Sequence, residues 1–349
     1  GRLAQLAEAV RQIEALPDPV GTIEEPCSRP SGVEVARMRV PLGVVFIVYE
    51  ARPNVTIDAA ALCVKSGNAV LLRGGREALR TNAALAQLFS AGLAEAGLPP
   101  DAALFIDEPN RELLYALLRR SGEIDLAIPR GGPALIDAVN EHARVPVVQH
   151  YQGICHVYVH ARANLEMAER IVINAKVQRP GVCNAMECLV VDAAVAPTFL
   201  PRITAALQSY GVELRVCERA LSILGEGAGV IPAAPSDYDT EFLGLRCAIK
   251  VVGDYDEALR FLEQHGSQHS ECIVTDDDTV ARRFQREVDA SCVLVNASTR
   301  FNDGGELGLG AELGISTTKL HAYGPMGLRE LTTRKFLVSG HGETRGTPP

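Results

Sequence analysis

The hydrophobic positions of the chain follow two alternating periods, which indicates parallel sheets covered by helices. Short apolar runs, typical of buried strands, are followed by amphipathic stretches that repeat every three to four residues. In the first half, strands are expected at 44–49, 69–72, 103–106, 124–128 and 145–148. Helices are expected between them at 58–65, 78–96, 111–120 and 133–142, after an initial helix that Pro17 and Pro19 end. Strands that alternate with helices predict a doubly wound parallel sheet.

The same alternation returns in the second half of the chain. A connecting strand at 154–160 and a helical pattern from Leu165 to Ala175 come first. Strands are then expected at 188–191, 212–216, 248–252, 272–275 and 292–295, with helices at 197–210, 255–265 and 278–289. The predicted fold class is therefore α/β, with two doubly wound parallel-sheet lobes.

Two polar, extended segments near the N-terminus predict a protruding β-hairpin arm. Segments 20–28 and 33–40 are joined by a Pro-Ser-Gly turn, and neither has an apolar face suited to a monomer core. The expected domains are a cofactor-binding domain at 1–18 and 41–152, a catalytic domain at 153–324, and oligomerisation elements at 19–40 and 325–349. Because the chain begins without Met and enters a helical pattern directly at Gly1, some structure is expected upstream.

Composition narrows the functional classes. The 349 residues carry 34 Lys+Arg against 43 Asp+Glu, a net charge of −9, without a basic and aromatic cluster that would suit nucleic acid. The longest apolar runs are far shorter than a membrane span. Nine cysteines without a C-x-x-C pair favour a reducing cytoplasm over a disulfide framework. No metal is predicted, since the spacing of the histidines does not suit metal ligands; those considered are His150, His156, His269 and His321.

One thiol has a setting that suits nucleophilic catalysis. Cys183 follows Pro180-Gly181, in a loop between a predicted helix and a predicted strand, where we expect the seam of the two lobes. A reactive thiol needs partial access and nearby positive charge, which Lys176 and Arg179 can supply. On the loop context alone, an inert thiol remains the alternative.

Two similar turns suggest a dinucleotide site. A strand, then Arg-Gly-Gly, then a helix occurs at Arg73-Gly74-Gly75 and again at Arg130-Gly131-Gly132. Glycines let backbone N–H groups approach a phosphate, although a purely structural turn is an equal alternative for either one. The strand that ends at Arg73 carries no acid for a ribose 2′-hydroxyl, and this favours NADP(H) over NAD(H).

A polar side chain follows the most apolar strand. Asn54, before a helix that Thr56 or Asp58 is expected to cap, has an amide that can donate to a developing oxyanion, with ordinary turn chemistry as the alternative. The Gly-rich segment 296–314 is expected to be a functional loop.

Four stretches together resemble a known family. They are EARPNVTIDAA at 50–60, LLRGG at 71–75, QRPGVCNAMECLVV at 178–191 and GELGLGAELGISTTKLHAYGPMGLRELTT at 305–333. They resemble the aldehyde dehydrogenase superfamily and, within it, the gamma-glutamyl phosphate reductases, the glutamate-5-semialdehyde dehydrogenases of proline biosynthesis. The resemblance extends along the whole chain.

The resemblance implies roles for individual residues. Cys183 matches the family's nucleophile, and Asn54 the side chain that forms the oxyanion hole with the Cys backbone N–H. Arg73 stands where relatives usually have a Lys against the adenosine ribose, and Gly131-Gly132 lies along the pyrophosphate turn. Glu241 is similar to the Glu that holds the nicotinamide ribose.

One departure from the family pattern bears on mechanism. Hydrolytic aldehyde dehydrogenases place a general-base Glu before a Gly-Gly, whereas the matching stretch here, 148–153, contains no carboxylate. The resemblance thus implies that Cys183 forms a thioester from L-glutamyl 5-phosphate, phosphate leaves, and NADPH reduces the thioester to the semialdehyde. Arg179 is the candidate that receives the phosphate, and Asp303 the candidate for the substrate ammonium.

Two other functions stay open at this stage. A thioester-forming dehydrogenase that uses coenzyme A would also lack the base, and a nucleotide-binding or assembly protein would leave the thiol idle. The expected partners are the small-molecule substrate, a second copy of the chain and, through the resemblance, the upstream glutamate kinase; neither nucleic acid nor membrane is expected.

The hairpin predicts an oligomer. Because segment 20–40 lacks a core-facing stripe and the terminal segment 334–338 can extend a shared sheet, we expect at least a dimer. Light scattering at micromolar concentration measures this directly, and a monomeric mass would contradict it.

Overall fold

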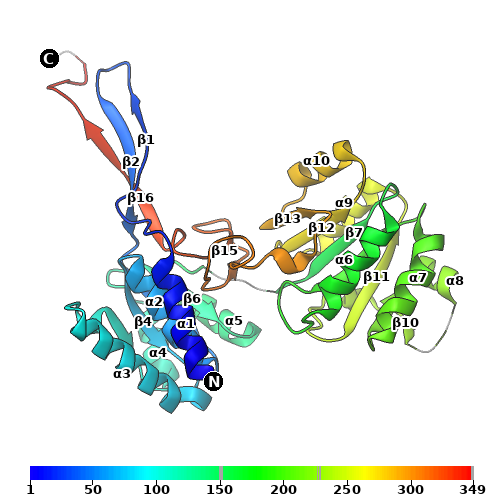
Figure 1. Cartoon of the computed structure of the whole chain (residues 1–349), viewed down its shortest axis with the longest axis horizontal. Helices are drawn as coiled ribbons and strands as arrows, with labels where there is room; N and C mark the ends of the chain where they lie inside the picture. The colour runs from blue at the N-terminus through cyan, green and yellow to red at the C-terminus, as the bar shows by residue number, and fades with distance from the viewer. Residues whose placement is uncertain (149–151, 226, 228, 347–349) are drawn as a thin grey trace. The chain divides into compact units, whose positions relative to one another are not determined.

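The computed structural model describes residues 1–148, 152–225, 227 and 229–346. These residues form two compact units. Unit 1 comprises residues 1–149, 308–314 and 320–349, and unit 2 comprises residues 150–307 and 315–319. The chain therefore leaves unit 1 after its parallel sheet and returns to it near the C-terminus (Figure 1).

Unit 1 is built on a four-stranded parallel sheet. Its strand order is β5-β4-β3-β6, with β3 (Val44–Tyr49), β4 (Ala69–Arg73), β5 (Ala103–Phe105) and β6 (Leu126–Arg130). Helices α1 (Arg2–Ala15), α2 (Pro53–Lys65) and α3 (Leu79–Glu95) pack with one face, and α4 (Arg111–Leu118) and α5 (Pro133–His142) with the other. Strand β3, buried from Val45 to Tyr49, contributes to both cores, as an apolar run in a parallel sheet predicts.

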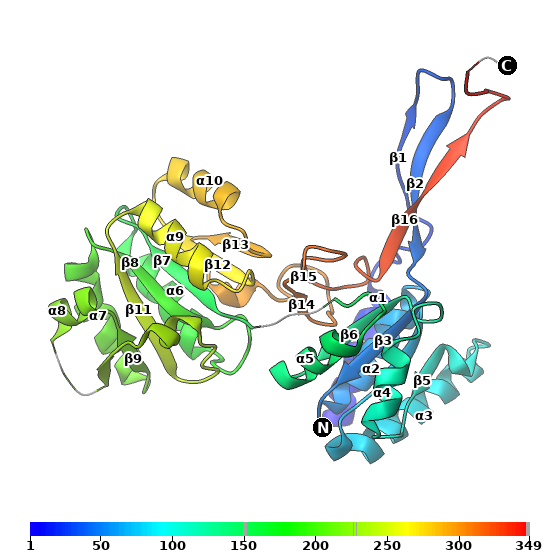
Figure 2. The same ribbon diagram turned by 180° about the vertical axis from the view of Figure 1, so that it is seen from behind.

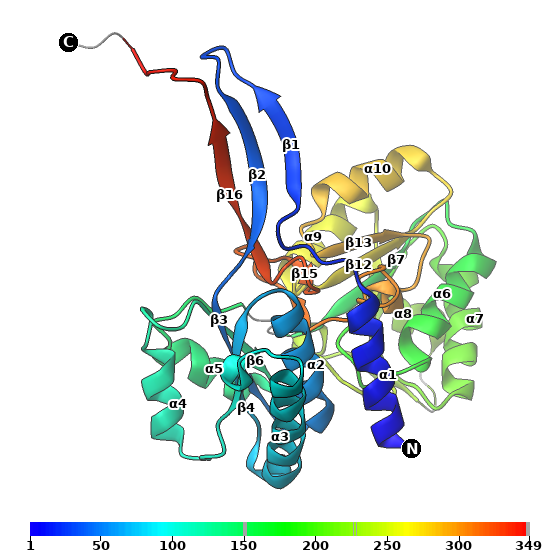
Figure 3. The ribbon, with the colours of Figure 1, turned by 60° about the vertical axis from the view of Figure 1, so that its left-hand side comes forward.

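A three-stranded antiparallel arm belongs to unit 1 (Figure 3). The hairpin of β1 (Ile23–Ser28) and β2 (Glu34–Pro41) turns at Gly32, whose φ of +94° suits a residue without a side chain. The terminal strand β16 (Thr332–Ser339) pairs with β2 along its whole length. The third strand of the arm thus comes from the same chain.

Unit 2 is built on a seven-stranded parallel sheet in the order β10-β9-β11-β8-β7-β12-β13. Its strands are β7 (Cys155–Val159), β8 (Met186–Asp192), β9 (Glu213–Val216), β10 (Val230–Pro232), β11 (Arg246–Val252), β12 (Ser270–Val274) and β13 (Cys292–Val295). One core includes α6 (Leu165–Val177), α7 (Ala196–Ser209) and α8 (Glu218–Leu224), and a second includes α9 (Tyr255–His265) and α10 (Asp278–Glu287), on opposite faces (Figure 2).

Short elements complete the chain. They are the 3₁₀ turns η1 (Arg76–Ala78), η2 (Pro100–Ala102), η3 (Pro235–Asp239) and η4 (Thr299–Phe301), and the two-residue strands β14 (Ile315–Ser316) and β15 (Gly324–Pro325). No helix in the described part of the chain combines the length and the apolar character that crossing a membrane requires.

The predicted fold class is confirmed, and three local predictions are wrong. Residues 145–148 form no described strand, because Pro146 has no N–H to donate and Val147 makes only an isolated bridge to Ala127. Helix α2 starts at Pro53 rather than at a Thr56 or Asp58 cap, with the proline at its first turn, where the missing N–H is not needed. The short elements α8 and β10 were not predicted from the sequence.

Candidate functional site

Cys183 lies in a tight loop between α6 and β8, and its side chain is half-buried. Pro180 prevents α6 from continuing, and β8 begins three residues after the thiol. The carbonyl oxygen of Cys183 accepts a hydrogen bond from the Cys155 thiol at 3.1 Å. The backbone of the loop is therefore held against the buried start of β7.

Most of the other cysteines are buried, although Cys217, just before α8, and Cys292, on β13, are half-buried as Cys183 is. Five of them are fully buried: Cys63, Cys155, Cys188, Cys247 and Cys272. Burial raises the pKa of Cys247 and of Cys272 to about 12, which keeps both as thiols at neutral pH. Cys27, on strand β1, is the exposed exception.

A buried ion pair stands directly behind the Cys183 loop. Lys176 at the end of α6 contacts Glu187 on β8, with 2.6 Å between Nζ and Oε2 and side chains that are 0% and 1% exposed. Burial raises the pKa of Glu187 to about 7, and Lys176 acts in the opposite direction. Glu187 thus compensates the positive charge of Lys176, which was expected from the sequence to act on the thiol of Cys183.

From this pair a chain of contacts leads to Glu241. The second oxygen of Glu187 accepts the backbone N–H of Leu243 at 3.3 Å, and Leu243 has a φ of +51°, unusual for this residue type. Glu241, half-buried, accepts the backbone N–H of Gly153, and burial raises its pKa. A Cβ at Gly153 would overlap the Cys183 carbonyl, so only glycine permits this close approach. The structure thereby brings Glu241 and Cys183 against the same short segment.

The charged candidates beside the thiol differ in how firmly they are held. Arg179 is exposed, one residue before the Pro-Gly turn. Asp303 is half-buried, and its Oδ1 accepts the backbone N–H groups of Gly305 at 3.0 Å and Glu306 at 3.4 Å. One oxygen of Asp303 therefore stabilises its own turn.

The first Arg-Gly-Gly turn of unit 1 borders a cavity of about 500 Å³. A Cβ at Gly74 would overlap the Asn82 amide, and one at Gly75 would lie 2.8 Å from Glu77 Oε2. A larger residue at either position would therefore displace a neighbouring side chain. The cavity falls within the usual size for cofactor sites, and its lining includes three cations, Arg73, Arg76 and Arg111, and two acids, Glu50 and Glu77.

Arg73 itself is held by the loop before α4. It donates to the carbonyl oxygens of Pro109 at 2.9 Å and Asn110 at 3.2 Å. Burial and the neighbouring Arg111 lower the pKa of Arg73, although arginine stays charged in proteins. This end of the cavity thus presents fixed positive charge of the kind that a phosphate requires.

The second turn is different, because an acid occupies it. The backbone N–H of Gly132 donates to Glu50 Oε1 at 3.0 Å, and a Cβ at Gly131 would lie 2.6 Å from Glu50 Cδ. The guanidinium of Arg130 packs against Gly314. The sequence pattern missed Glu50, whose carboxylate takes the place expected for an anionic ligand group.

Asn54 lies in the first turn of α2, with its side chain exposed. Its Nδ2 donates to Asp58 Oδ2 at 3.2 Å, one helical turn away, which leaves the second N–H of the amide for another acceptor. Burial raises the pKa of Asp58, opposed by this hydrogen bond. Within the stretch that lacks a general base, Gln149, His150 and Tyr151 lie outside the described residues.

Comparison with known proteins agrees with this geometry. Residues 3–217 match the Aldehyde dehydrogenase family. The chain belongs to the aldehyde dehydrogenase family. It is 58% identical over 345 residues to a gamma-glutamyl phosphate reductase of Anaeromyxobacter sp. (strain K), covering 99% of this chain and 81% of that protein. It is 52% identical over 349 residues to the protein of the same name in Aquifex aeolicus, covering 99% and 80%.

A solved structure agrees as well. The crystal structure of gamma-glutamyl phosphate reductase from Thermotoga maritima is 44% identical and has a TM-score of 0.96, covering 99% of this chain and 83% of that one. The resemblance inferred from the four sequence stretches is thereby confirmed, at the level of the family and of its gamma-glutamyl phosphate reductase relatives.

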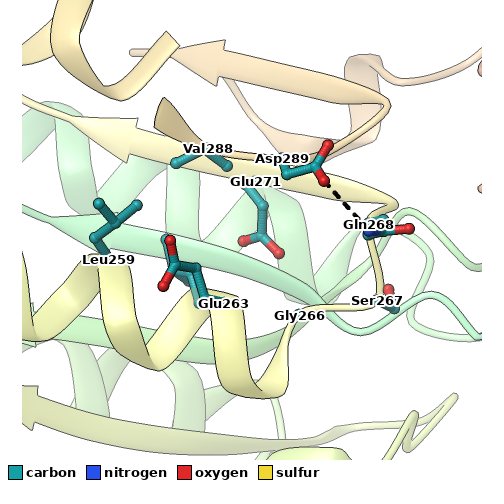
Figure 4. Close-up of a pocket in the computed structure, with 9 residues that line it drawn as sticks. Leu259, Glu263, Gly266, Ser267, Gln268, Glu271, Val288 and Asp289 are labelled. Atoms are coloured by element: carbon teal, nitrogen blue, oxygen red, sulfur yellow. Dashed lines mark hydrogen bonds between the residues drawn. The ribbon is translucent and has the colours of Figure 1, made fainter. Parts of the chain in front are cut away.

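A second cavity lies in unit 2, beside the end of α9 (Figure 4). It measures about 390 Å³, and its lining includes Glu271 and Asp289. Glu271 is already paired with His156 at 3.0 Å, and Asp289 with Lys319 at 2.7 Å. Glu263 is the third carboxylate of the lining, and because the other two have partners, we assign this cavity no ligand.

The buried pair makes a stability prediction. Lys176→Met leaves Glu187 buried without its cation, which we expect to lower the free energy of unfolding by about 3–5 kcal/mol. Because Lys176 lowers the pKa of Glu187, its loss moves that pKa further above about 7, and the deficit grows from pH 6 to pH 8.5 as the carboxylate ionises. Urea unfolding at several pH values measures both effects.

The matched control removes both charges. Lys176→Met combined with Glu187→Leu replaces the pair by apolar side chains of similar volume, and we expect it to recover most of the loss. A single variant as stable as the unaltered protein at pH 8.5 would contradict the assigned role of the pair.

The loop geometry makes a reactivity prediction. Cys183 should be alkylated first among the nine cysteines, because it combines partial access with the nearby Arg179 charge, whereas most others are buried. Mass-spectrometric mapping after brief iodoacetamide treatment, with Cys183→Ala as the control, gives the order. Cys27 is the main competitor, and its faster modification would count against a reactive Cys183.

Proposed function

We propose that the protein reduces L-glutamyl 5-phosphate to L-glutamate 5-semialdehyde in proline biosynthesis, with NADPH as the reductant and Cys183 as the nucleophile. The observation that carries this proposal is the half-buried Cys183 loop, fixed by the buried core behind it, in a chain 58% identical to a gamma-glutamyl phosphate reductase. A cytoplasmic location is part of the proposal, supported by nine free cysteines.

The thiolate of Cys183 begins the reaction. Its Sγ attacks the acyl carbon, the bond from that carbon to the phosphate oxygen breaks, and phosphate leaves with the bonding electrons. The Cys183 backbone N–H and the Asn54 amide are the proposed donors to the oxyanion that develops on the carbonyl. Arg179 is proposed to receive the phosphate, and Asp303 the substrate ammonium through its second oxygen.

The residues of unit 1 fit the phosphate-bearing half of NADP(H). Gly74 and Gly75 place no side chain over the backbone of the turn, and Arg73 supplies fixed charge at the cavity of about 500 Å³. Arg130, Gly131 and Gly132 keep a proposed role at the pyrophosphate, although Glu50 must release the Gly132 N–H for that contact. Glu241 is proposed to hold the nicotinamide ribose.

The cofactor supplies, when bound, the hydride that reduces the Cys183 thioester. Cys183 then leaves as thiolate when the carbonyl of the semialdehyde forms. Because the sequence from Val148 to Gly153 contains no carboxylate, the thioester lacks the usual base that activates water. Slow hydrolysis by water leaves the Cys183 thioester intact until the hydride is transferred.

The decisive experiment runs the reaction backwards. Stopped-flow oxidation of the semialdehyde with excess NADP⁺ is expected to give a burst of about one NADPH per active site without phosphate, and steady turnover with phosphate. Cys183→Ala is the control that should abolish the burst. Equal steady rates with and without phosphate would show that water is the acceptor and would contradict the proposal.

Two other outcomes favour the alternatives. Turnover that depends on coenzyme A instead of phosphate would assign the thioester to the related acylating chemistry. Absence of any burst in the unaltered protein would favour a nucleotide-binding protein with an idle thiol.

A further inference from the structure

The loop that carries Cys183 is fastened on both sides to a single short segment. Before the thiol, Gln178 Oε1 accepts a hydrogen bond from Arg300 Nε at 2.9 Å. After the thiol, Asn184 Nδ2 donates to the carbonyl oxygen of Asn302 at 2.9 Å. Both partners belong to η4 and the residue that follows it. The position of Arg300 is thus tied to that of the Cys183 loop.

The segment that carries Arg300 is itself rigidly held. The Asn302 side chain is completely buried and donates to Ser270 Oγ at 2.8 Å, at the start of β12. Ser298 Oγ accepts the backbone N–H of Arg300 at 3.3 Å. Because both ends of η4 are anchored, little conformational freedom is left for the Arg300 backbone to lose when a ligand binds.

The guanidinium of Arg300 keeps donors for a ligand. Its recorded side-chain hydrogen bond within the described part of the chain engages Nε alone, so its two terminal nitrogens retain their N–H groups. The pKa of Arg300 is lowered, chiefly by burial and also by the positive charge of Arg179, whereas Asp303 raises it. The effect of Arg179 indicates that the two positive charges lie near each other. A second guanidinium beside a half-buried one suits an anion that both can contact.

Arg300 is better placed to hold an anion than Arg179. Arg300 is half-buried and tethered through Nε, whereas Arg179 is exposed. An exposed charge is screened by salt and loses side-chain entropy on binding, and both effects weaken its contribution. The tethered arginine is therefore expected to supply most of the binding.

We propose that Arg300 binds the phosphate group that leaves the acyl carbon beside Cys183, with Arg179 as a secondary contact, and thereby makes phosphate the partner that exchanges with the thioester. This inference rests on the proposed function and assigns its phosphate site. Gln178 is a positioning residue that orients the guanidinium.

The chemistry balances without another reagent. In the reductive direction Cys183 Sγ bonds to the acyl carbon, the carbon–oxygen bond to the phosphoryl group breaks, and phosphate departs with the electron pair. In the reverse direction a phosphate oxygen attacks the thioester carbon and the carbon–sulfur bond breaks, which returns the thiolate. Arg300 stabilises the phosphate in both directions through paired, charge-assisted N–H donation.

The test separates the phosphate-independent burst from the phosphate-dependent turnover. For Arg300→Ala, we expect a burst within about twofold of the unaltered protein and a rise of ~10–100-fold in the phosphate concentration for half-maximal turnover. Arg300→Lys should fall between the two, because an ammonium replaces the charge but not the forked donor geometry. Arg282→Ala, an exposed arginine on α10, is the matched control and should change neither value.

Gln178 provides an independent variant. Gln178→Ala should raise the half-saturating phosphate concentration by less than Arg300→Ala does, because the guanidinium remains but loses its tether. The double variant should be no worse than Arg300→Ala alone, since Gln178 acts only through Arg300. If Arg300→Ala does not fold, Arg300→Lys and Gln178→Ala still give a result.

Several outcomes would overturn the inference. An unchanged phosphate response in Arg300→Ala would refute it, and a raised KM for the semialdehyde with an unchanged phosphate response would assign Arg300 to the substrate carboxylate. Loss of the burst in the folded variant would indicate a role in thioester formation instead. By contrast, if the unaltered protein shows no phosphate-dependent turnover, the proposed function itself fails.

Discussion

The ion pair of Lys176 and Glu187 is the contact on which the neighbourhood of Cys183 depends. It joins the end of α6 to the start of β8 in a place without exposed surface, and the intervening loop carries the thiol. Separating the two side chains costs much free energy, because either one alone would be a buried, uncompensated charge. The same Glu187 accepts the N–H of Leu243, so the pair also fixes the segment that presents Glu241. One buried interaction thereby supports two sides of the site.

The two units hold their positively charged and N–H donor groups in different ways. In unit 1, backbone close approach and fixed arginines border a cavity, and Glu50 already satisfies one of the turn's N–H groups. In unit 2, one positive charge is tied to the loop of the thiol, because Gln178 holds Arg300. Tethering limits the entropy that these side chains lose when an anion binds.

Much of the fold was predictable because parallel sheets leave a strong pattern. The strand at 44–49 and the helices at 133–142 and 255–265 have the predicted bounds, since continuous apolar runs and amphipathic repeats mark them directly. The error at 145–148 has a local cause, Pro146, that outweighed the apolar pattern. The missed α8 and β10 are too short to show a clear period.

The sequence by itself determined the α/β class, the arm and the Arg-Gly-Gly turns, because each follows from residues close together in the chain, and it made Cys183 the candidate nucleophile through its loop context and the family resemblance. Only the tertiary structure decided which charges meet. In the sequence, Lys176 is a cation close to the thiol, but in the structure Glu187 lies 2.6 Å from it and compensates its charge. Arg300 lies 117 positions from Cys183 in the sequence, yet its side chain is tied to the same loop through Gln178. Contacts of this kind depend on how the strands are ordered in the sheet, and hydrophobic periodicity carries no information about that order.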